Sequence, residues 1–209
     1  MKKTGKTKTR IKLFAAIVGI FVATAISPFK LAAYEYYGWW NDPLKLKTGI
    51  TSGSYTIFAT DGLQYGGKTF MFATAWKSAM GEWNDKTEAA IPYHGDVGGV
   101  ERIRMDGYNH GMNGVHGWVD MYSGPKLVGH RQQAPTESWD YVVANINAYY
   151  LTNHTYAQYR GVAIHEIGHA LGLAHEQDGT PSIMNDLLNI PNTYLVPQQD
   201  DINGVNNLY

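Results

Sequence analysis

The chain has 209 residues, with 17 Lys and Arg against 18 Asp and Glu, a formal net charge of −1, and no cysteine. This length fits one domain behind a short N-terminal segment, and the missing cysteine excludes both a disulfide framework and a thiol nucleophile. No excess of basic residues is present to attract a phosphate backbone, so nucleic acid is not an expected partner.

The first 33 residues are predicted to be a secretory signal peptide. Met1–Lys12 carries six basic residues and no acidic one, and Leu13–Ile26 is a nearly unbroken apolar run of 14 residues. A basic segment followed by such a run is typical of a signal peptide, and the run is too short for an ordinary membrane span. The small residues that end at Ala25 and at Ala33 are the candidate cleavage sites. An uncleaved N-terminal anchor is the alternative.

Residues 34–209 are expected to form one secreted domain. If cleavage follows Ala33, ten basic residues remain against 18 acidic ones, which gives the domain a formal charge of −8. A domain of this size buries enough apolar surface to be stable without disulfides. We expect a monomer that has no stable membrane association after the signal is removed.

The first part of the domain is predicted to contain strands, glycine-rich loops and one helix. The aromatic segment Tyr34–Asp42 is expected to pack on the domain. Four apolar residues recur at helical spacing, which predicts a helix over Thr69–Trp83. Aromatic and β-branched content, or alternation of polar and apolar residues, predicts strands at Ser54–Ala59, Ala89–Tyr93, Glu101–Asp106, Trp118–Tyr122 and Leu127–Gln132.

The C-terminal part is predicted to contain the best-defined strand and two helices. Tyr141–Leu151 has the β-branched and aromatic content of a strand. A helix over Thr155–Leu173 should follow, because Thr155 and Gln158 form a capping-box pattern. Pro197–Tyr209 is predicted to be a closing helix, since proline suits the first helical position.

Residues 165–175 read HEIGHALGLAH and contain the pattern H-E-x-x-H-x-x-G-x-x-H. His165 and His169 lie four residues apart, so on a helix both imidazoles can face one metal ion. Gly172 can adopt the positive φ that ends a helix, and the chain can then return His175 as a third ligand. Nitrogen ligands favour zinc, and three of them leave a position open for water, as in catalytic sites. Glu166 is placed beside the metal as the general base for that water.

The histidine pattern and the methionine that follows it resemble those of the metzincin zinc peptidases. Ser182-Ile183-Met184 is similar to the Met turn of the matrixins (matrix metalloproteinase-like proteins), and Asp200–Tyr209 is similar to their closing D-D-I-x-G-I-x-x-L-Y helix. The likeness is to a small, secreted, bacterial-type member; it is strong over Tyr141–Tyr209 and architectural before that. Astacins and serralysins fit less well, because they carry a tyrosine where this chain has Asp186.

The resemblance implies an α+β, zincin-like fold. We expect a twisted, mostly parallel sheet of about five strands with two long helices, plus a small C-terminal subdomain that holds the Met turn and the closing helix. The resemblance also implies one catalytic Zn²⁺, and it leaves open a Ca²⁺ site or a second, structural Zn²⁺. The spacing of His94, His110, His116 and His130 does not match the family's structural-zinc pattern, so these histidines are interpreted as surface or core residues.

The chain departs from the matrixins in its means of latency. It lacks the propeptide cysteine that keeps those enzymes inactive. Latency is therefore either absent or dependent on Tyr34–Lys47, where a carboxylate of Glu35 or Asp42 is the candidate cap for the zinc.

These features predict a secreted zinc endopeptidase that acts on proteins or peptides. An extended substrate is expected to add to an edge strand, with Asn185–Tyr194 lining the specificity pocket. One alternative is a secreted, zinc-containing adhesin that binds without cutting, although such a protein has no need of Glu166. A zinc hydrolase for a non-peptide amide is a third reading, and the matrixin-like tail argues against it.

Overall fold

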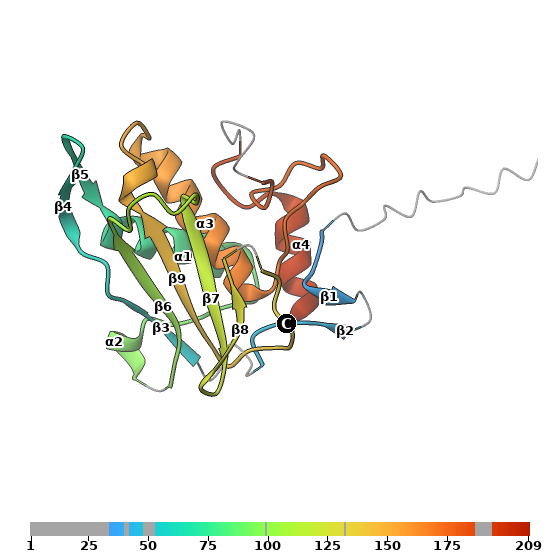
Figure 1. Cartoon of the computed structure of the whole chain (residues 1–209). Coiled ribbons are helices and arrows are strands. Elements are labelled where there is room, and N and C mark those ends of the chain that lie inside the picture. The colour runs from blue at the N-terminus through green and yellow to red at the C-terminus, as the bar shows by residue number, and fades with distance from the viewer. Residues whose placement is uncertain (1–33, 40–41, 48–52, 99, 132, 187–193) are drawn as a thin grey trace, which may run out of the picture. The chain divides into compact units, whose positions relative to one another are not determined.

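The computed structural model describes residues 34–39, 42–47, 53–98, 100–131, 133–186 and 194–209 (Figure 1). The predicted signal peptide and both candidate cleavage sites lie outside the described residues. Within the described ranges, no helix is both long and apolar enough to cross a membrane.

A five-stranded mixed sheet forms the centre of the domain. Its strands, in spatial order, are β3 (Gly53–Ile57), β6 (Val100–Tyr108), β9 (Tyr141–Asn147), β7 (Gly117–Ser123) and β8 (Lys126–His130). β3, β6 and β9 are parallel, whereas β7 is antiparallel to both β9 and β8. The expectation of a mostly parallel sheet therefore applies to only three strands. The two residues between β7 and β8, Gly124 and Pro125, make a connection so short that it can join only antiparallel strands.

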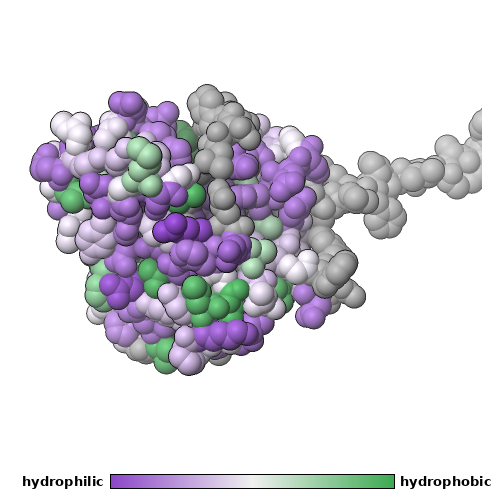
Figure 2. All heavy atoms as spheres, viewed as in Figure 1, coloured by the Kyte–Doolittle hydropathy of each residue, from purple (hydrophilic) through white to green (hydrophobic). Residues whose placement is uncertain are grey.

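Two long helices, α1 (Phe72–Lys86) and α3 (Tyr156–Leu171), pack against each other and against the sheet (Figure 1). The core between these layers is aromatic and aliphatic, with Trp76, Trp83 and Trp139 fully buried. The smaller elements are β1 (Gly38–Trp39), β2 (Asp42–Pro43), β4 (Asp61–Tyr65), β5 (Lys68–Met71), α2 (His94–Val97), the 3-10 helix η2 (Ala148–Tyr150) and α4 (Gln199–Leu208). The face shown in Figure 2 is largely hydrophilic, with apolar areas that are small and separated.

The structure shifts the beginning of two predicted helices. The predicted helix over Thr69–Trp83 begins only at Phe72, because Lys68–Met71 pairs with β4 as the second strand of a hairpin. The closing helix begins at Gln199, with Gln198 as its N-cap, rather than at Pro197. The residues before α1 are held by a partner outside the helix, which its own sequence pattern does not reveal. Before α4, Gln198 forms a capping box with Asp201 of the helix itself.

The predicted strand Ala89–Tyr93 is wrong. Asn84 takes both backbone groups of Ile91: its side-chain oxygen accepts from Ile91 N at 2.9 Å and its amide donates to Ile91 O at 2.8 Å. Pro92 has no backbone N–H to donate. A single isolated bridge between Tyr55 and Tyr93 is all the sheet pairing that remains.

Helix α3 begins at the predicted capping box and ends at Leu171, two residues before the predicted end. Thr155 and Gln158 form a complete capping box, and Gly172 ends the helix at a φ of 120°. Its C-terminal half is buried on all sides, so His165, Glu166 and His169 are enclosed together with the apolar residues. Trp83 of α1 donates its indole N–H to Ile164 O at 2.9 Å, which fixes the two helices against each other.

Gly168 lets a methionine approach α3 closely. A Cβ at Gly168 would collide with the sulfur of Met184 and would lie 3.2 Å from Trp83 Cζ2. The glycine lowers helix propensity by up to about 1 kcal/mol relative to alanine, and the close packing of a buried methionine offsets that cost. The position thus requires glycine for packing.

Gly168→Ala should destabilise the protein by about 1–2 kcal/mol, because overpacking of the core exceeds the gain in helix propensity. Gly81→Ala in α1 is the matched control, since nothing lies within 4 Å of a Cβ there. That control should stabilise the protein by about 0.5–1 kcal/mol. Urea unfolding of both variants measures the difference, and equal stabilisation by the two substitutions would contradict this account of Gly168.

Candidate metal centre

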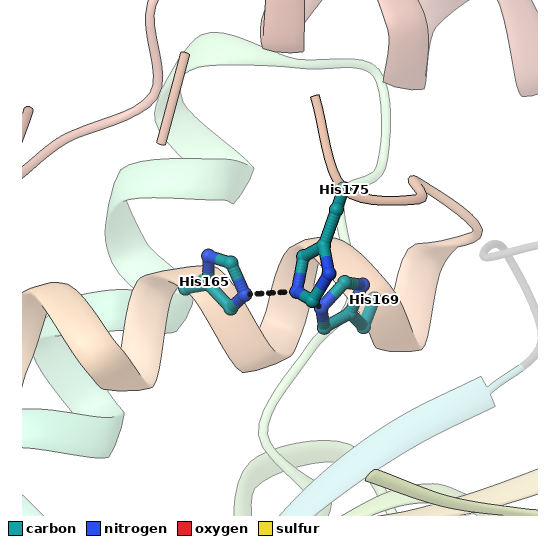
Figure 3. Close-up of side chains that lie close together, drawn as sticks. All are labelled: His165, His169 and His175. Atoms are coloured by element: carbon teal, nitrogen blue, oxygen red, sulfur yellow. Dashed lines mark hydrogen bonds between the residues drawn. The ribbon is translucent and has the colours of Figure 1, made fainter. Parts of the chain in front are cut away.

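Three imidazoles converge at the C-terminal half of α3 (Figure 3). His165 and His169 rise from the same face of the helix, and His175 comes from the segment that follows it. Nε2 of His175 lies 3.2 Å from Nε2 of His165 and 3.0 Å from Nε2 of His169. The structure thus brings together the three residues that the sequence pattern selects as metal ligands.

The opposite ring nitrogens fix how two of these imidazoles are protonated. Nδ1 of His165 lies 2.8 Å from Ile183 O, and Nδ1 of His169 lies 2.8 Å from Leu173 O. A carbonyl oxygen can only accept, so both Nδ1 atoms carry the proton and donate it. A neutral ring in this tautomer leaves Nε2 as a bare lone pair, which is the form that binds a metal ion.

The geometry fits a tetrahedral zinc ion. Zn–N distances of about 2.0–2.1 Å place the ligand nitrogens of a tetrahedron about 3.3–3.4 Å apart, close to the 3.0 and 3.2 Å found here. Burial lowers the pKa of all three histidines, that of His165 to about 3, so the rings stay neutral as ligands must. His165, His169 and His175 would therefore hold the ion.

The aromatic segment that begins at Tyr34 supports the turn that brings His175 back toward α3. Backbone N–H groups bond from Tyr37 to Gly172 O at 3.3 Å and from Ala174 to Glu35 O at 2.9 Å. The Tyr37 hydroxyl also lies 3.0 Å from Nδ1 of His169, as a second acceptor for its proton. This bears out the expectation that the aromatic N-terminal segment packs on the domain. Neither Glu35 nor Asp42, the candidate zinc caps, belongs to the metal-binding group of described residues.

Helix α4 holds the turn at Ile183 and Met184, which lies beneath α3. The buried Asp201 carboxylate accepts from Ile183 N at 2.9 Å, from Gln198 N at 2.7 Å and from the hydroxyl of Ser182. Ile183 O in turn accepts from His165. Asp201, the second aspartate of the closing tail, is therefore connected to His165 through one residue, Ile183. Its signal in the sequence was the likeness of that tail to the family's closing helix.

Glu166 is buried beside the histidines, with a 3% exposed side chain. Burial raises its pKa well above the ordinary value of a carboxyl group. Among the described residues, its Oε2 has no hydrogen-bond partner, so this oxygen can take up or release a proton. The space for the carboxylate exists because Gly117 of β7 has no side chain: a Cβ there would lie 2.5 Å from Oε1. No sequence pattern indicates this role for Gly117.

Gly117→Ala should displace Glu166 without disturbing the three metal ligands. We expect catalytic turnover to fall by about 10-fold or more, because small misplacements of reacting groups are costly. Bound zinc, measured by elemental analysis, should remain at one equivalent, and Gly81→Ala should retain full activity. Unchanged turnover in Gly117→Ala would show that the spacing at this glycine does not matter.

Two hollows flank the metal ligands. The first is bordered by His165, Glu166 and the start of β7, and the second by residues 35–38 of the N-terminal segment. His169, His175, Arg131 and Asp186 border both. Of the predicted specificity-pocket segment Asn185–Tyr194, residues 187–193 lie outside the described residues.

Three further histidines, His94, His110 and His130, have partners of their own, whereas His116 borders the first hollow. His94 pairs with the hydroxyl of Ser54 at 2.9 Å, and His130 pairs with Asp120. His110 packs edge-on against Trp118. In the described ranges, no second group of three or more His, Asp or Glu side chains is arranged for a metal.

A buried amide fixes the loop that precedes β7. Asn147 donates to Gly111 O at 2.9 Å and to Asn113 Oδ1 at 2.8 Å, and its oxygen accepts from His110 N at 3.0 Å. The loop leads directly into Gly117. The sequence predicts Asn147 inside a strand, and no pattern around it indicates this role.

Comparison with known proteins identifies the family. The family model described as Matrixin matches residues 68–209, which is most of the chain. The match begins well before Tyr141, where the strong resemblance in sequence starts. The chain therefore belongs to the matrixin family of zinc metallopeptidases.

A curated relative agrees with this assignment, and a solved structure has a similar fold. Matrix metalloproteinase-27 of Homo sapiens is 33% identical over 86 residues, which cover 41% of this chain and only 15% of that protein. The solved GM1 bound form of the ECX AB5 holotoxin contains a chain with a TM-score of 0.53 and 16% identity. That match covers 84% of this chain and 86% of the other, and at such low identity it concerns the fold alone.

Proposed function

We propose that this protein is a secreted zinc endopeptidase that hydrolyses peptide bonds in extended protein or peptide substrates. The observation that carries the proposal is the position of Glu166. Its carboxylate is buried within one hollow together with the three convergent histidines, and one of its oxygens has no partner among the described residues. A zinc-binding protein without catalytic function has no need of a carboxylate placed in this way.

Zinc and Glu166 have separate roles in the proposed mechanism. Bound zinc would supply Lewis-acid chemistry, by lowering the pKa of a water and polarising the scissile carbonyl. Glu166 takes the proton of the attacking water and later gives it to the leaving amine. Its position in one hollow with the three histidines supports this role.

Strand β7 supports the proposed mode of substrate binding. Its pairing with β8 covers only Asp120 to Ser123, whereas Gly117 and Trp118 border the first hollow. An extended peptide can therefore add its backbone to the start of β7, next to the metal ligands.

Glu166→Gln should lower turnover by about 10²–10⁴-fold, because it removes the general base while keeping the size of the side chain. Zinc should remain bound at one equivalent, since Glu166 is not a ligand. Glu88→Gln, at an exposed position, is the control for loss of one carboxylate. Turnover of Glu166→Gln close to that of the unmodified protein would contradict the proposed mechanism.

Removal of the metal separates the peptidase from the adhesin alternative. Clearing of gelatin or casein in a zymogram should disappear with a zinc chelator and return when zinc is restored. The failure of the metal-loaded protein to cut any protein, or any member of a peptide library, would favour the binding function.

A further inference from the structure

We propose that the guanidinium of Arg131 is a specificity-determining group that binds a carboxylate of the peptide substrate, an inference that rests on the peptidase function proposed above. Arg131 follows β8 directly and borders both hollows beside the metal ligands. The other charged side chains along these hollows, outside the metal ligands, are acidic: Glu166, Asp186 and Glu35.

The backbone holds Arg131 in an unfavourable conformation. Its φ is 52°, the only positive φ of a non-glycine residue among those described. Arg131 N donates to Val119 O at 3.2 Å, while His130 and Gln133 exchange two backbone hydrogen bonds around it. An arginine has no intrinsic preference for this region, whereas glycine and asparagine do. Strain that the surrounding structure maintains is a recurrent property of binding sites.

The side chain of Arg131 is positioned by an aromatic ring, and it has no charged partner among the described residues. Its guanidinium carbon lies 5.4 Å from the centre of the Trp118 ring, and the Trp118 indole is itself fixed by a 3.1 Å bond to Asp120. The ion pairs and side-chain hydrogen bonds among the described residues do not include the Arg131 guanidinium. Arg131 is exposed, so its donors are available to a ligand. A guanidinium that packs on an aromatic ring and has free N–H groups is suited to a planar carboxylate.

The end of β8 defines where that carboxylate would lie. Because Arg131 N occupies Val119 O, a peptide that adds to Gly117 and Trp118 cannot continue along β7 in the row of β8. One substrate position is then fixed beside Arg131. We expect a preference for a carboxylate at one defined distance from the scissile bond, rather than a general preference for acidic peptides. The net acidic charge of the domain would oppose such a general preference.

The test compares Arg131→Asn with the unmodified zinc-loaded protein on a peptide library. Aspartate and glutamate are scanned through every position, and each peptide is made with a free and with an amidated C-terminus. Asparagine tolerates the positive φ, and it removes the guanidinium together with most of the aliphatic stem. Lys126→Ala, at the other end of β8, is the control for loss of one positive charge.

We expect a preference for a carboxylate at one position that falls by about tenfold or more in Arg131→Asn, mainly through KM, and is unchanged in Lys126→Ala. Dependence on Asp or Glu identifies a side chain as the ligand, and dependence on the free terminus identifies the terminal carboxylate. Direct binding of the preferred peptide to Glu166→Gln, with and without Arg131→Asn, should show the same loss in Kd.

Two results overturn the inference and are distinguishable. Chelator-sensitive cleavage with no carboxylate preference, or with a preference that survives in Arg131→Asn, excludes the role of Arg131 and leaves the peptidase function intact. The absence of chelator-sensitive cleavage by the unmodified protein overturns both proposals.

Discussion

The candidate metal centre depends on holding three neutral imidazoles together, with Nε2 of His175 only 3.2 Å from that of His165 and 3.0 Å from that of His169. Lone pairs at such distances repel one another unless a cation lies between them, so each ring must be held from behind. Ile183 O and Leu173 O do this for His165 and His169. Ile183 lies in the turn beneath α3, and Leu173 lies in the segment that follows Gly172. Both carbonyls must be held in place, and buried hydrogen bonds accordingly connect these two segments with α3 and α4.

Two glycines set the distances around α3. On one side Gly168 admits the sulfur of Met184, and on another Gly117 of β7 leaves room for the Glu166 carboxylate. In both places a missing side chain is what lets a functional or supporting group occupy buried space. The metal centre is therefore defined as much by where Cβ atoms are absent as by the residues that point toward it, because a close-packed interior cannot accommodate even one additional carbon freely.

Local chemistry made the metal-binding helix predictable. The capping box at Thr155, the positive φ of Gly172 and the spacing of His165, Glu166 and His169 are properties of adjacent residues, and all three appear in the structure. The helix that begins too late at Phe72 and the missing strand at Ala89–Tyr93 have non-local causes. The first results from pairing with β4, and the second from the side chain of Asn84. The supporting contacts of Tyr37, Gly117 and Asn147 escaped prediction for the same reason, since each joins segments far apart in the chain.

The same contacts bear on how the activity could be controlled. The sequence suggested that Tyr34–Lys47 could block the metal through a carboxylate, but Tyr37 instead donates its backbone N–H to Gly172 O and offers its hydroxyl to His169. The segment thus lies behind a ligand, where it supports the orientation of the ring, and the chain has no cysteine to replace the missing cap. Withdrawal of this segment would remove support from His169 and from the return to His175. In this arrangement the contacts of Glu35 and Tyr37 support the positions of the histidines.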